Sequence, residues 1–528
     1  MLESYKQYIE GNKALIPESI TVIEENAFSN CISLEYIIMP NSITEIGNYA
    51  FDGCTSLLSI VIPDSVTRVG LGAFSHCTGL ESIEIPERVI EIGDDAFWNC
   101  SSLTSIYIPA SVSHIGNHAF SNCSSLKSLI VSPNNDNYLS ESNCILSKDG
   151  RSLLFGCMQS VIPESVLEIS DNAFFVCKSL TYVEIPNSVI RIGHQAFYGC
   201  SNLSSIEIPD SVSIICDNAF RSCKRLSSIE IPDSVGHIGK DAFRGCEALL
   251  SVELPHNILK IVNGTFADCT SLTNIVIPSS VTEIESYAFY HCKGLSSIYI
   301  PERINKIDSS AFVSCISINS INVSPENQNY SSKSNCILSK DGSILYLGCK
   351  ESKIPDGITK IADSAFSGCE HLKDIIIPAS VLIIGDSAFF GCKGLTSIII
   401  PNNVNYIGYS AFAYCTGLSS IKIPDSVSEI GNRAFSDCAG LTFIEISNTI
   451  KTFGSLTFDR CSNISQICLH SKNPEEMENL IYYPGMKPDK ITLYVPVGTG
   501  YAYRHNLFFK QFKETIATNH RPLPIDAK

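Results

Sequence analysis

The cysteines are the first residues in this chain whose type and spacing could support chemistry. The sequence has 23 Cys in 528 residues, or one in about 528/23 ≈ 23 positions. Thiols can form disulfides, hold a metal ion or act as nucleophiles. Seventeen of them come three residues after a Phe in a repeating pattern, and no C-x-x-C pair with zinc-binding spacing occurs. We therefore expect a column of small buried thiols and no metal site at these seventeen positions.

The other six cysteines lie outside that pattern and leave redox chemistry open. They are Cys144, Cys157, Cys216, Cys336, Cys349 and Cys468. Cys144 and Cys157 occupy the same places in one segment as Cys336 and Cys349 in a similar second segment, so each pair could form a cross-strand disulfide if the chain is exported. Cys468 falls at an outward position of a predicted strand, which makes it the best candidate for an exposed thiol.

Motifs for catalysis or cofactor binding do not occur in the sequence. There is no H-E-x-x-H, G-x-S-x-G, P-loop or complete G-x-G-x-x-G, because the pair Gly70 and Gly72 lacks the third glycine. His114 and His118 are four residues apart, but Gly116 between them predicts a corner and not one helical face that could hold zinc. We therefore predict a protein that is not an enzyme, with no catalytic residue, no metal and no cofactor.

The charge balance narrows the class of partner. Lys and Arg number 37 against 54 Asp and Glu, a formal net charge of −17. This charge would repel a phosphate backbone or an anionic lipid surface, so we expect neither nucleic acid nor a membrane as the partner. No apolar run approaches the ~18–20 residues that cross a bilayer. The first residues, MLESYKQYIEGNKAL, lack the basic and apolar regions of a secretion signal.

A 23-residue repeat positions these residues. Pro recurs every 23 residues from Pro17 to Pro109, and Phe keeps the same period in three runs of five, seven and five units. The unit is I-P-x-S-V-x-x-I-G-x-x-A-F-x-x-C-x-x-L-x-S-I-x. Its L-x-S-I-x-I part alternates apolar and polar residues and predicts a short strand that ends at Pro. Its A-F-x-x-C-x-x-L part has apolar residues at helical spacing and predicts a turn of α- or 3-10 helix. Stacked units would bury Phe, Ile and Leu between the two.

The unit resembles the BspA-like (Treponema pallidum-type) subfamily of leucine-rich repeat proteins. L-x-x-I-x-I is similar to the family's strand and A-F-x-x-C-x-x-L to the subfamily signature, over roughly residues 14–470. The resemblance implies a leucine-rich repeat solenoid, as a horseshoe or a right-handed superhelix. A parallel sheet would line its concave face and short helical turns its convex face. The resemblance also implies surface-exposed adhesion proteins of host-associated bacteria and some protozoa, which contact host matrix or neighbouring cells.

Two segments interrupt the repeat, and each end needs a cap. The Phe spacing widens to 54, or 23 + 31, around residues 132–162 and 324–354. Asp149-Gly150 and Asp341-Gly342 are hairpin-turn dipeptides, so we predict two variant rungs with a β-hairpin on the convex side and 17 + 2 = 19 rungs in all. We expect an N-terminal cap and first strand at 1–16 and the solenoid at 17–470. A C-terminal cap at 471–513 would contain an amphipathic helix at 499–512, and 514–528 would be a loose tail.

The outward positions of the predicted strands are the candidate ligand-binding residues. The x of I-x-I-P points away from the core of the concave sheet, where packing does not restrict it. Four consecutive units carry Glu there, which would favour a cationic partner, and flanking units carry apolar or aromatic residues that suit a protein contact. A solvated acidic face and ordinary strand preference would give the same pattern. The candidates are Glu84, Tyr107, Ile130, Glu184, Glu207, Glu230, Glu253, Val276, Tyr299, Ile376, Ile399 and Lys422.

These features together predict a binding scaffold. We expect an adhesin-like protein, at the cell surface or secreted, that recognises a protein such as a host matrix protein, or a glycan, through the concave sheet face. The alternative is an intracellular protein–protein interaction scaffold in the cytoplasm, which the unpaired thiols and the lack of a secretion signal favour.

Overall fold

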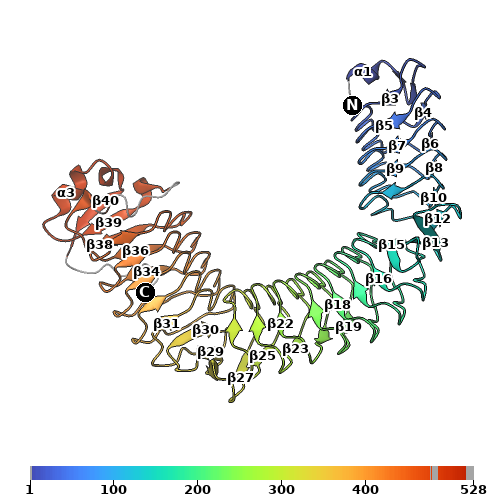
Figure 1. Ribbon diagram of the computed structural model, residues 1–528. Coiled ribbons are helices and arrows are strands. Elements are labelled where there is room, and N and C mark those ends of the chain that lie inside the picture. Colours follow the sequence, from blue (N-terminus) through green and yellow to red (C-terminus); the bar gives the residue numbers. More distant parts are fainter. Residues whose placement is uncertain (1–2, 476, 478–485, 519–528) are drawn as a thin grey trace. The chain divides into compact units, whose positions relative to one another are not determined.

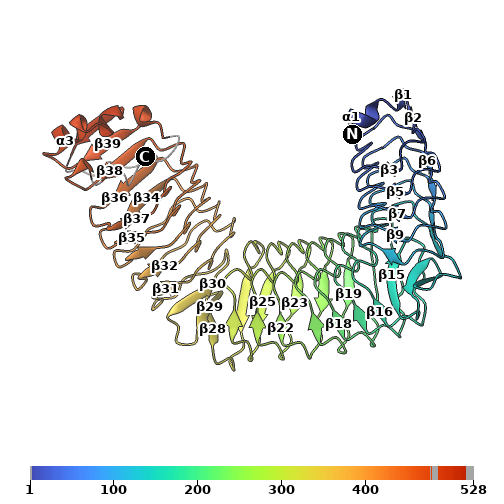
Figure 2. The same cartoon turned by 45° about the horizontal axis from the view of Figure 1, so that its top comes forward.

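Each 23-residue unit forms one turn, or rung, of a solenoid in the computed structural model, which describes residues 3–475, 477 and 486–518. The rungs fall into two compact units. Unit 1 comprises Met1–Ile258 with Gly264–Thr270, and unit 2 comprises Leu259–Asn263 with Ser271–Lys528. The same coil recurs within each unit (Figures 1 and 2). The leucine-rich repeat solenoid expected from the sequence is thus confirmed.

The L-x-S-I-x-I segments form parallel strands, as predicted, and we call their sheets the S-I-x-I face. Partners are one repeat apart, as in Ser105↔Ser128 and Tyr107↔Ile130, and every second side chain is exposed. In unit 1 the strands are β2 (Lys13–Leu15), β4 (Tyr36–Ile38), β6 (Ser59–Val61), β8 (Ser82–Glu84), β10 (Ser105–Ile108), β12 (Ser128–Val131), β19 (Ser228–Glu230) and β21 (Ser251–Glu253). In unit 2 they are β23 (Asn274–Val276), β25 (Ser297–Ile300), β27 (Ser320–Val323), β34 (Ser420–Ile423), β36 (Phe443–Ile446) and β38 (Gln466–Leu469).

A second parallel sheet, which the sequence analysis did not anticipate, is formed by the residue pair before each Gly corner, and we call it the E-I face. The second residue of each pair is mostly buried, and the residue before it, which is charged or polar in most pairs, faces out. Unit 1 contains β3 (Val22–Ile23), β5 (Glu45–Ile46), β7 (Arg68–Val69), β9 (Glu91–Ile92), β11 (His114–Ile115), β16 (Glu168–Ile169), β17 (Arg191–Ile192), β18 (Ile214–Ile215) and β20 (His237–Ile238). Unit 2 contains β22 (Lys260–Ile261), β24 (Glu283–Ile284), β26 (Lys306–Ile307), β31 (Lys360–Ile361), β32 (Ile383–Ile384), β33 (Tyr406–Ile407), β35 (Glu429–Ile430) and β37 (Thr452–Phe453).

The A-F-x-x-C segment is a chain of turns, and the predicted turn of helix is wrong in this detail. The residues two before and two after the Phe adopt positive φ, for example 58° at both Asn26 and Asn30, which no helix tolerates. Their N–H groups therefore donate to the next rung and not within a helix. Asn26 N bonds the Asn48 oxygen at 2.9 Å, and Asn30 N bonds the Asp52 oxygen at 2.6 Å. The turns thus add inter-rung hydrogen bonds on the side of the rung that the sequence predicted to be helical.

The core is a column of stacked Phe rings beside a column of thiols. Phe28 and Phe51 lie with ring centroids 5.3 Å apart and planes 1° apart, and the same stacking recurs along both units. Most of the thiols in this column donate to the Phe carbonyl of the rung before them, as Cys54 Sγ does to the Phe28 oxygen at 3.2 Å. The Cys therefore satisfies a backbone acceptor while filling a small apolar space.

Each interruption is a three-stranded antiparallel segment that extends the E-I face, so the predicted hairpin is one half of it. In unit 1 the strands are β13 (Tyr138–Glu141), β14 (Cys144–Ser147) and β15 (Ser152–Gly156), and β15 pairs in parallel with β16. In unit 2 they are β28 (Tyr330–Lys333), β29 (Cys336–Ser339) and β30 (Ile344–Leu347), and β30 pairs with β31. The hydroxyl of Tyr138 accepts the Ile115 N–H at 3.2 Å, so the segment also closes the edge left by β11.

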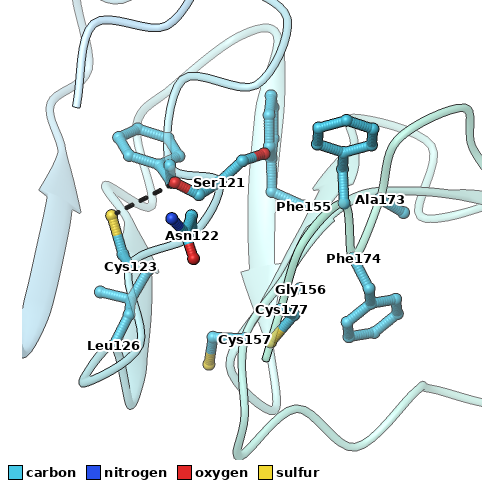
Figure 3. A pocket seen from close by; sticks show the side chains of 12 residues that line it. Ser121, Asn122, Cys123, Leu126, Phe155, Gly156, Cys157, Ala173, Phe174 and Cys177 are labelled. Carbon is cyan, nitrogen blue, oxygen red and sulfur yellow. Dashed lines mark hydrogen bonds between the residues drawn. The ribbon is translucent and has the colours of Figure 1, made fainter. Parts of the chain in front are cut away.

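The first interruption leaves a small cavity between the rungs on either side of it. Its volume is about 20 Å³, and its lining includes Phe120, Phe155, Phe174 and the thiols Cys157 and Cys177 (Figure 3). The space suits one water molecule and no larger ligand. We therefore treat it as a packing defect where one run of Phe rungs ends and the next begins.

The two caps are more structured than the sequence suggested. At the N-terminus α1 (Glu3–Lys6) precedes β1 (Ile9–Glu10), which pairs antiparallel with β2. At the C-terminus η1 (Pro488–Lys490) leads to β39 (Thr492–Val495), and the predicted long helix is divided into α3 (Gly500–His505) and η2 (Phe509–Gln511). The expected loose tail is wrong at its start, because β40 (Glu514–Ala517) adds a further strand to β39. Residues 519–528 of that tail lie outside the described residues.

Candidate protein-binding surface

All twelve candidate residues lie on the S-I-x-I face with exposed side chains. The alternation of the strands dictates this, since Ser and x point outward while the two Ile point into the core. The most exposed large apolar residues of the described chain are among them, Ile376 at 85% and Ile399 at 84%. Strand periodicity alone therefore placed these side chains correctly, although it does not say what touches them.

The four consecutive glutamates differ in how firmly the structure aligns them. Glu230 and Glu253 are register partners in β19 and β21. Glu184 and Glu207 lie in the first two rungs after the interruption, where the chain is extended but forms no strand on this face. The two rungs after the second interruption, which carry Ile376 and Ile399, also form no strand on this face. The missing strands therefore follow from the inserted segment and not from the glutamate charges. That segment adds a strand to the E-I face but none to the S-I-x-I face.

These four carboxylates have no counter-charge. Within the described ranges, none of them forms an ion pair or a side-chain hydrogen bond. Unit charges at a strand spacing of ~4.8 Å repel by about 0.9 kcal/mol in water. Asp233 nearby is different, because hydrogen bonds from His256 to its carboxylate lower its pKa.

The E-I face shows how this chain treats stacked charges elsewhere. Arg68 lies between Glu45 and Glu91 of the adjacent rungs, at 2.7 Å and 3.3 Å from their carboxylate oxygens. In unit 2 Glu283 lies between Lys260 and Lys306, and both ion pairs form. These hydrogen bonds from the two lysines lower the pKa of Glu283. Alternation of sign along the solenoid is therefore common in this protein, and the four glutamates depart from it.

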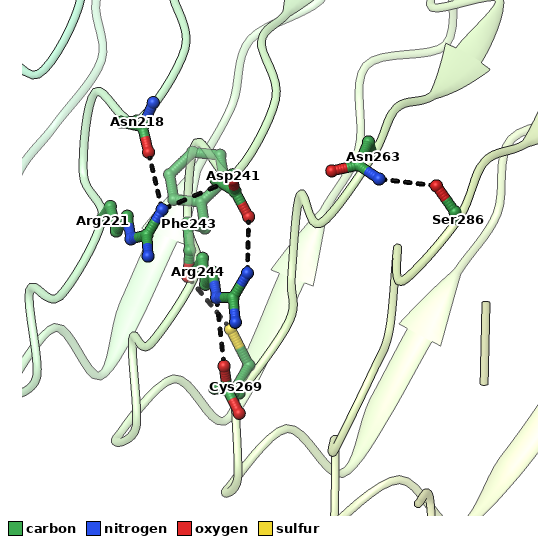
Figure 4. Close-up of polar contacts among 9 residues, drawn as sticks. Asn218, Arg221, Asp241, Phe243, Arg244, Asn263, Cys269 and Ser286 are labelled. Carbon is green, nitrogen blue, oxygen red and sulfur yellow. Dashed lines mark hydrogen bonds and ion pairs between the residues drawn. The ribbon is translucent and has the colours of Figure 1, made fainter. Parts of the chain in front are cut away.

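The turn side of unit 1 follows the same alternation. Arg221 Nη1 lies 3.4 Å from Asp241, and Arg244 lies 3.3 Å from the same carboxylate (Figure 4). Arg244 also lies 3.1 Å from Asp268. These three ion pairs run across three successive rungs. Pairs of this kind are individually weak at a surface, but they remove the repulsion that stacking like charges would cause.

Apolar and aromatic side chains accompany the charged column on the S-I-x-I face. In unit 1 Tyr107 is 42% and Ile130 47% exposed, and they are register partners in β10 and β12. In unit 2 Val276 is 63% and Tyr299 52% exposed. Each unit therefore carries exposed apolar area on the strand side, which is the usual composition of a protein-binding surface.

The cysteines are buried structural groups. All 23 are free thiols, and only Cys177 and Cys369 are partly exposed. Burial raises the pKa of Cys54 to about 12, so such thiols stay protonated and unreactive at neutral pH. The disulfides allowed by the sequence are not formed, since Cys144 and Cys157 are free and buried.

The pair in the second interruption, Cys336 and Cys349, is likewise free and buried. The exposed thiol expected at Cys468 is wrong, because this side chain is only 7% exposed. The position does face outward, but the outward side chains of the last rungs are covered. The neighbouring outward residue Glu445 is only 4% exposed, although it is charged.

The sequence analysis missed a charged pocket in unit 2. Glu445 in β36 accepts from His470 Nε2 at 3.1 Å, and Lys422 Nζ in β34 lies 3.6 Å from the same oxygen. A pocket of about 300 Å³ opens over them. Of these three residues, only Lys422 was a candidate from the sequence, because the three side chains come together only when three rungs stack.

Two further searches of the described residues gave negative results. Residues 3–475, 477 and 486–518 contain no group of three or more His, Cys, Asp or Glu arranged to hold a metal ion. In the same part of the chain, no helix combines the length and apolar character that a membrane span requires.

Stacked parallel rungs with an Ile- and Leu-lined core and an exposed strand face define a leucine-rich repeat protein. The chain belongs to the family described as BspA type leucine rich repeat region, whose model matches residues 3–143, 156–258, 213–339 and 345–475. The family expected from the sequence unit is thereby confirmed. No curated protein sequence matches the chain.

Solved structures agree with the family. A leucine rich cell surface protein from Faecalibacterium prausnitzii A2-165 is 28% identical with a TM-score of 0.57, over 65% of this chain and 97% of that one. A leucine-rich repeat protein from Bacteroides ovatus is also 28% identical, with a TM-score of 0.44 over 75% of this chain and 87% of that one. The family model and the Faecalibacterium prausnitzii structure thus both describe leucine-rich repeat proteins.

Proposed function

We propose that this protein is a non-enzymatic, adhesin-like binding scaffold that recognises a protein ligand through its S-I-x-I face. The observation that carries the proposal is the column of Glu184, Glu207, Glu230 and Glu253. Several stacked charges on the E-I face and on the turns are paired, as at Arg68 and Arg244, whereas no ion pair offsets the repulsion among these four carboxylates. A cationic surface of a partner would relieve that repulsion, and the exposed Tyr107 and Ile130 of the same unit would add apolar contact.

The class of ligand follows from this chemistry. A basic protein surface fits the column better than a glycan does, because uncharged hydroxyls would leave the carboxylates unneutralised. A protein of the host matrix or of a neighbouring cell is the partner that family resemblance suggests. The structurally similar protein from Faecalibacterium prausnitzii is described as a cell surface protein, which supports a location at the cell surface or outside the cell.

A pull-down with matched charge variants tests the proposal. The intact chain is presented to an extracellular-matrix protein preparation, and captured proteins are compared for wild type and for Glu207→Lys with Glu230→Lys. We expect the variant to lose basic partners, and wild-type binding to weaken with salt because the contact is electrostatic. The control variant, Glu326→Lys with Glu351→Lys, makes the same charge change at exposed positions of unit 2. Equal capture by all three proteins would refute a role for the column.

A further inference from the structure

The pocket over Glu445 in unit 2 has features of a small-ligand site that is separate from the glutamate column. Its lining includes Asn402, Lys422, Asp425, Ser426 and His470 and, together with Glu445, spans four successive rungs. Its volume of about 300 Å³ is at the lower end of the range for ligand pockets and is large enough to admit one sugar ring. Unlike the lining of the cavity at the first interruption, its lining is mostly polar.

The floor of the pocket is a buried charge held in place by two cations. Glu445 is 4% exposed, yet its Oε1 atom lies 3.1 Å from His470 Nε2 and 3.6 Å from Lys422 Nζ. A carboxylate is rarely buried without such partners. Hydrogen bonds to Cys468 and Glu445 raise the pKa of His470, so the imidazole is protonated at neutral pH.

The rim carries hydrogen-bonding groups that the protein itself does not use. In the described part of the chain, neither the Asn402 amide nor the Asp425 carboxylate has a hydrogen-bond or ion-pair partner. Ser426 donates its hydroxyl proton to the Val404 oxygen at 2.7 Å, which leaves its own oxygen free to accept. The rim therefore offers both donors and acceptors to a ligand.

The pocket presents groups of both signs, and this mixture restricts the ligand. Lys422 and His470 face the Glu445 carboxylate, while the Asp425 carboxylate at the rim has no such partner among the described residues. Hydroxyl groups both donate and accept, and they match such a mixed rim without adding charge. Ile399 does not line the pocket, but it occupies the position equivalent to Lys422 one rung earlier and is 84% exposed, so its side chain is available to the C–H face of a ring that extends past Lys422.

We propose that this pocket binds one neutral monosaccharide unit of a glycan. Asn402 and Asp425 bond ring hydroxyls, Lys422 donates to a third hydroxyl, and Ile399 packs against the C–H face. The Glu445–His470 pair holds Lys422 in position from below. The site gives unit 2 a glycan contact that is independent of the protein contact proposed for unit 1.

Saturation-transfer NMR on the full chain tests this site. The probes are glucose, galactose, mannose and N-acetylglucosamine at millimolar concentration, with N-acetylneuraminic acid and glutamate as charged comparisons. We expect at least one neutral sugar to bind, and Asn402→Ala and Asp425→Asn each to weaken it about tenfold or more. The matched control is Asp64→Asn, which changes the exposed residue after Pro in a rung that has Val61 in place of Lys422.

Three results would overturn the proposal. These are the absence of any neutral-sugar signal with wild type, binding of the charged probes alone, and equal sugar binding by wild type, Asn402→Ala and Asp425→Asn. Circular dichroism melts show whether each variant is folded, and Asp425→Asn keeps the size of an exposed side chain. The Glu207→Lys with Glu230→Lys variant should bind sugar normally, so failure of this site and failure of the unit 1 proposal are distinguishable.

Discussion

Replacing Asn135 should destabilise the first interruption far more than its small size suggests. Its side chain is fully buried and makes four hydrogen bonds. Nδ2 donates to the Pro109 oxygen at 2.9 Å and the Val112 oxygen at 2.8 Å, while Oδ1 accepts from Asn137 N at 2.8 Å and Tyr138 N at 2.9 Å. In regular rungs a Ser hydroxyl of the next rung satisfies the equivalent carbonyl, as Ser111 does for Val89. Where the repeat is interrupted, the side chain of Asn135 donates to this carbonyl instead.

The cost of Asn135→Ala can be worked from these bonds. The Val112 oxygen is left buried without this donor, at about 1–3 kcal/mol. The Pro109 oxygen keeps a bond from Val112 N at 3.3 Å, so it loses one bond of about 0.5–1.5 kcal/mol. The N–H groups of Asn137 and Tyr138 lie near solvent, and each loses one hydrogen bond of about 0.5–1.5 kcal/mol. The sum is at least about 2.5 kcal/mol in the free energy of unfolding.

Equilibrium urea unfolding with hydrogen exchange measures the effect. We expect a lower midpoint for Asn135→Ala, and faster exchange in peptides covering residues 109–113 and 135–140. The control Asn134→Ala removes an exposed side chain and should stay within about 0.5 kcal/mol of wild type. Asn327 makes the same four bonds in unit 2, so Asn327→Ala should behave alike. If Asn135→Ala and Asn134→Ala unfold at the same midpoint, the reasoning is refuted.

Two further predictions concern titratable groups. Hydrogen bonds to Cys468 and Glu445 raise the pKa of His470. The stability this gives is therefore fully present below the unfolded value of about 6.5 and is lost as pH rises through the folded pKa. Thermal melts of His470→Gln should differ most from wild type near the lower pH, and a difference that grows on raising the pH would contradict this. Burial also protects the thiols, with the pKa of Cys54 raised to about 12. A thiol reagent should label the folded chain slowly and all 23 Cys in denaturant, whereas rapid labelling of the folded chain would disprove it.

The repeat made most of the fold predictable, because the same residues recur seventeen times at the same spacing. The S-I-x-I segment of the sequence alternates between outward and inward residues over four positions, and this is long enough for the period of two to be recognised, although the strands themselves span three or four residues. The E-I strands are only two residues long, so alternation could not reveal them. A signal was nonetheless present in the opposite charges of Glu45, Arg68 and Glu91 at 23-residue intervals.

The predicted helical turn failed for an equally local reason. Phe and Cys three residues apart fit a helix, but they fit successive turns as well. The residues two before and two after Phe decide between them, since they are often Asn, Gly, Asp, His or Ser. Asn and Gly tolerate positive φ best, as at Asn26 and Gly53. The pocket over Glu445 could not be predicted from one unit, because it needs side chains from several rungs and the unusual burial of an outward carboxylate.

The alternating charges of the E-I face bear on how a chain of near-identical rungs folds without error. Neighbouring repeats are so alike that a rung could dock on the next but one and leave a loop of 23 residues between them. Such a skip would place Glu45 beside Glu91, or Lys260 beside Lys306, in the positions that Arg68 and Glu283 occupy in the native order. The like charges would disfavour the mistaken alignment while the correct one gains a contact. The alternating charges therefore favour the native order of the repeats over an alignment that skips one rung.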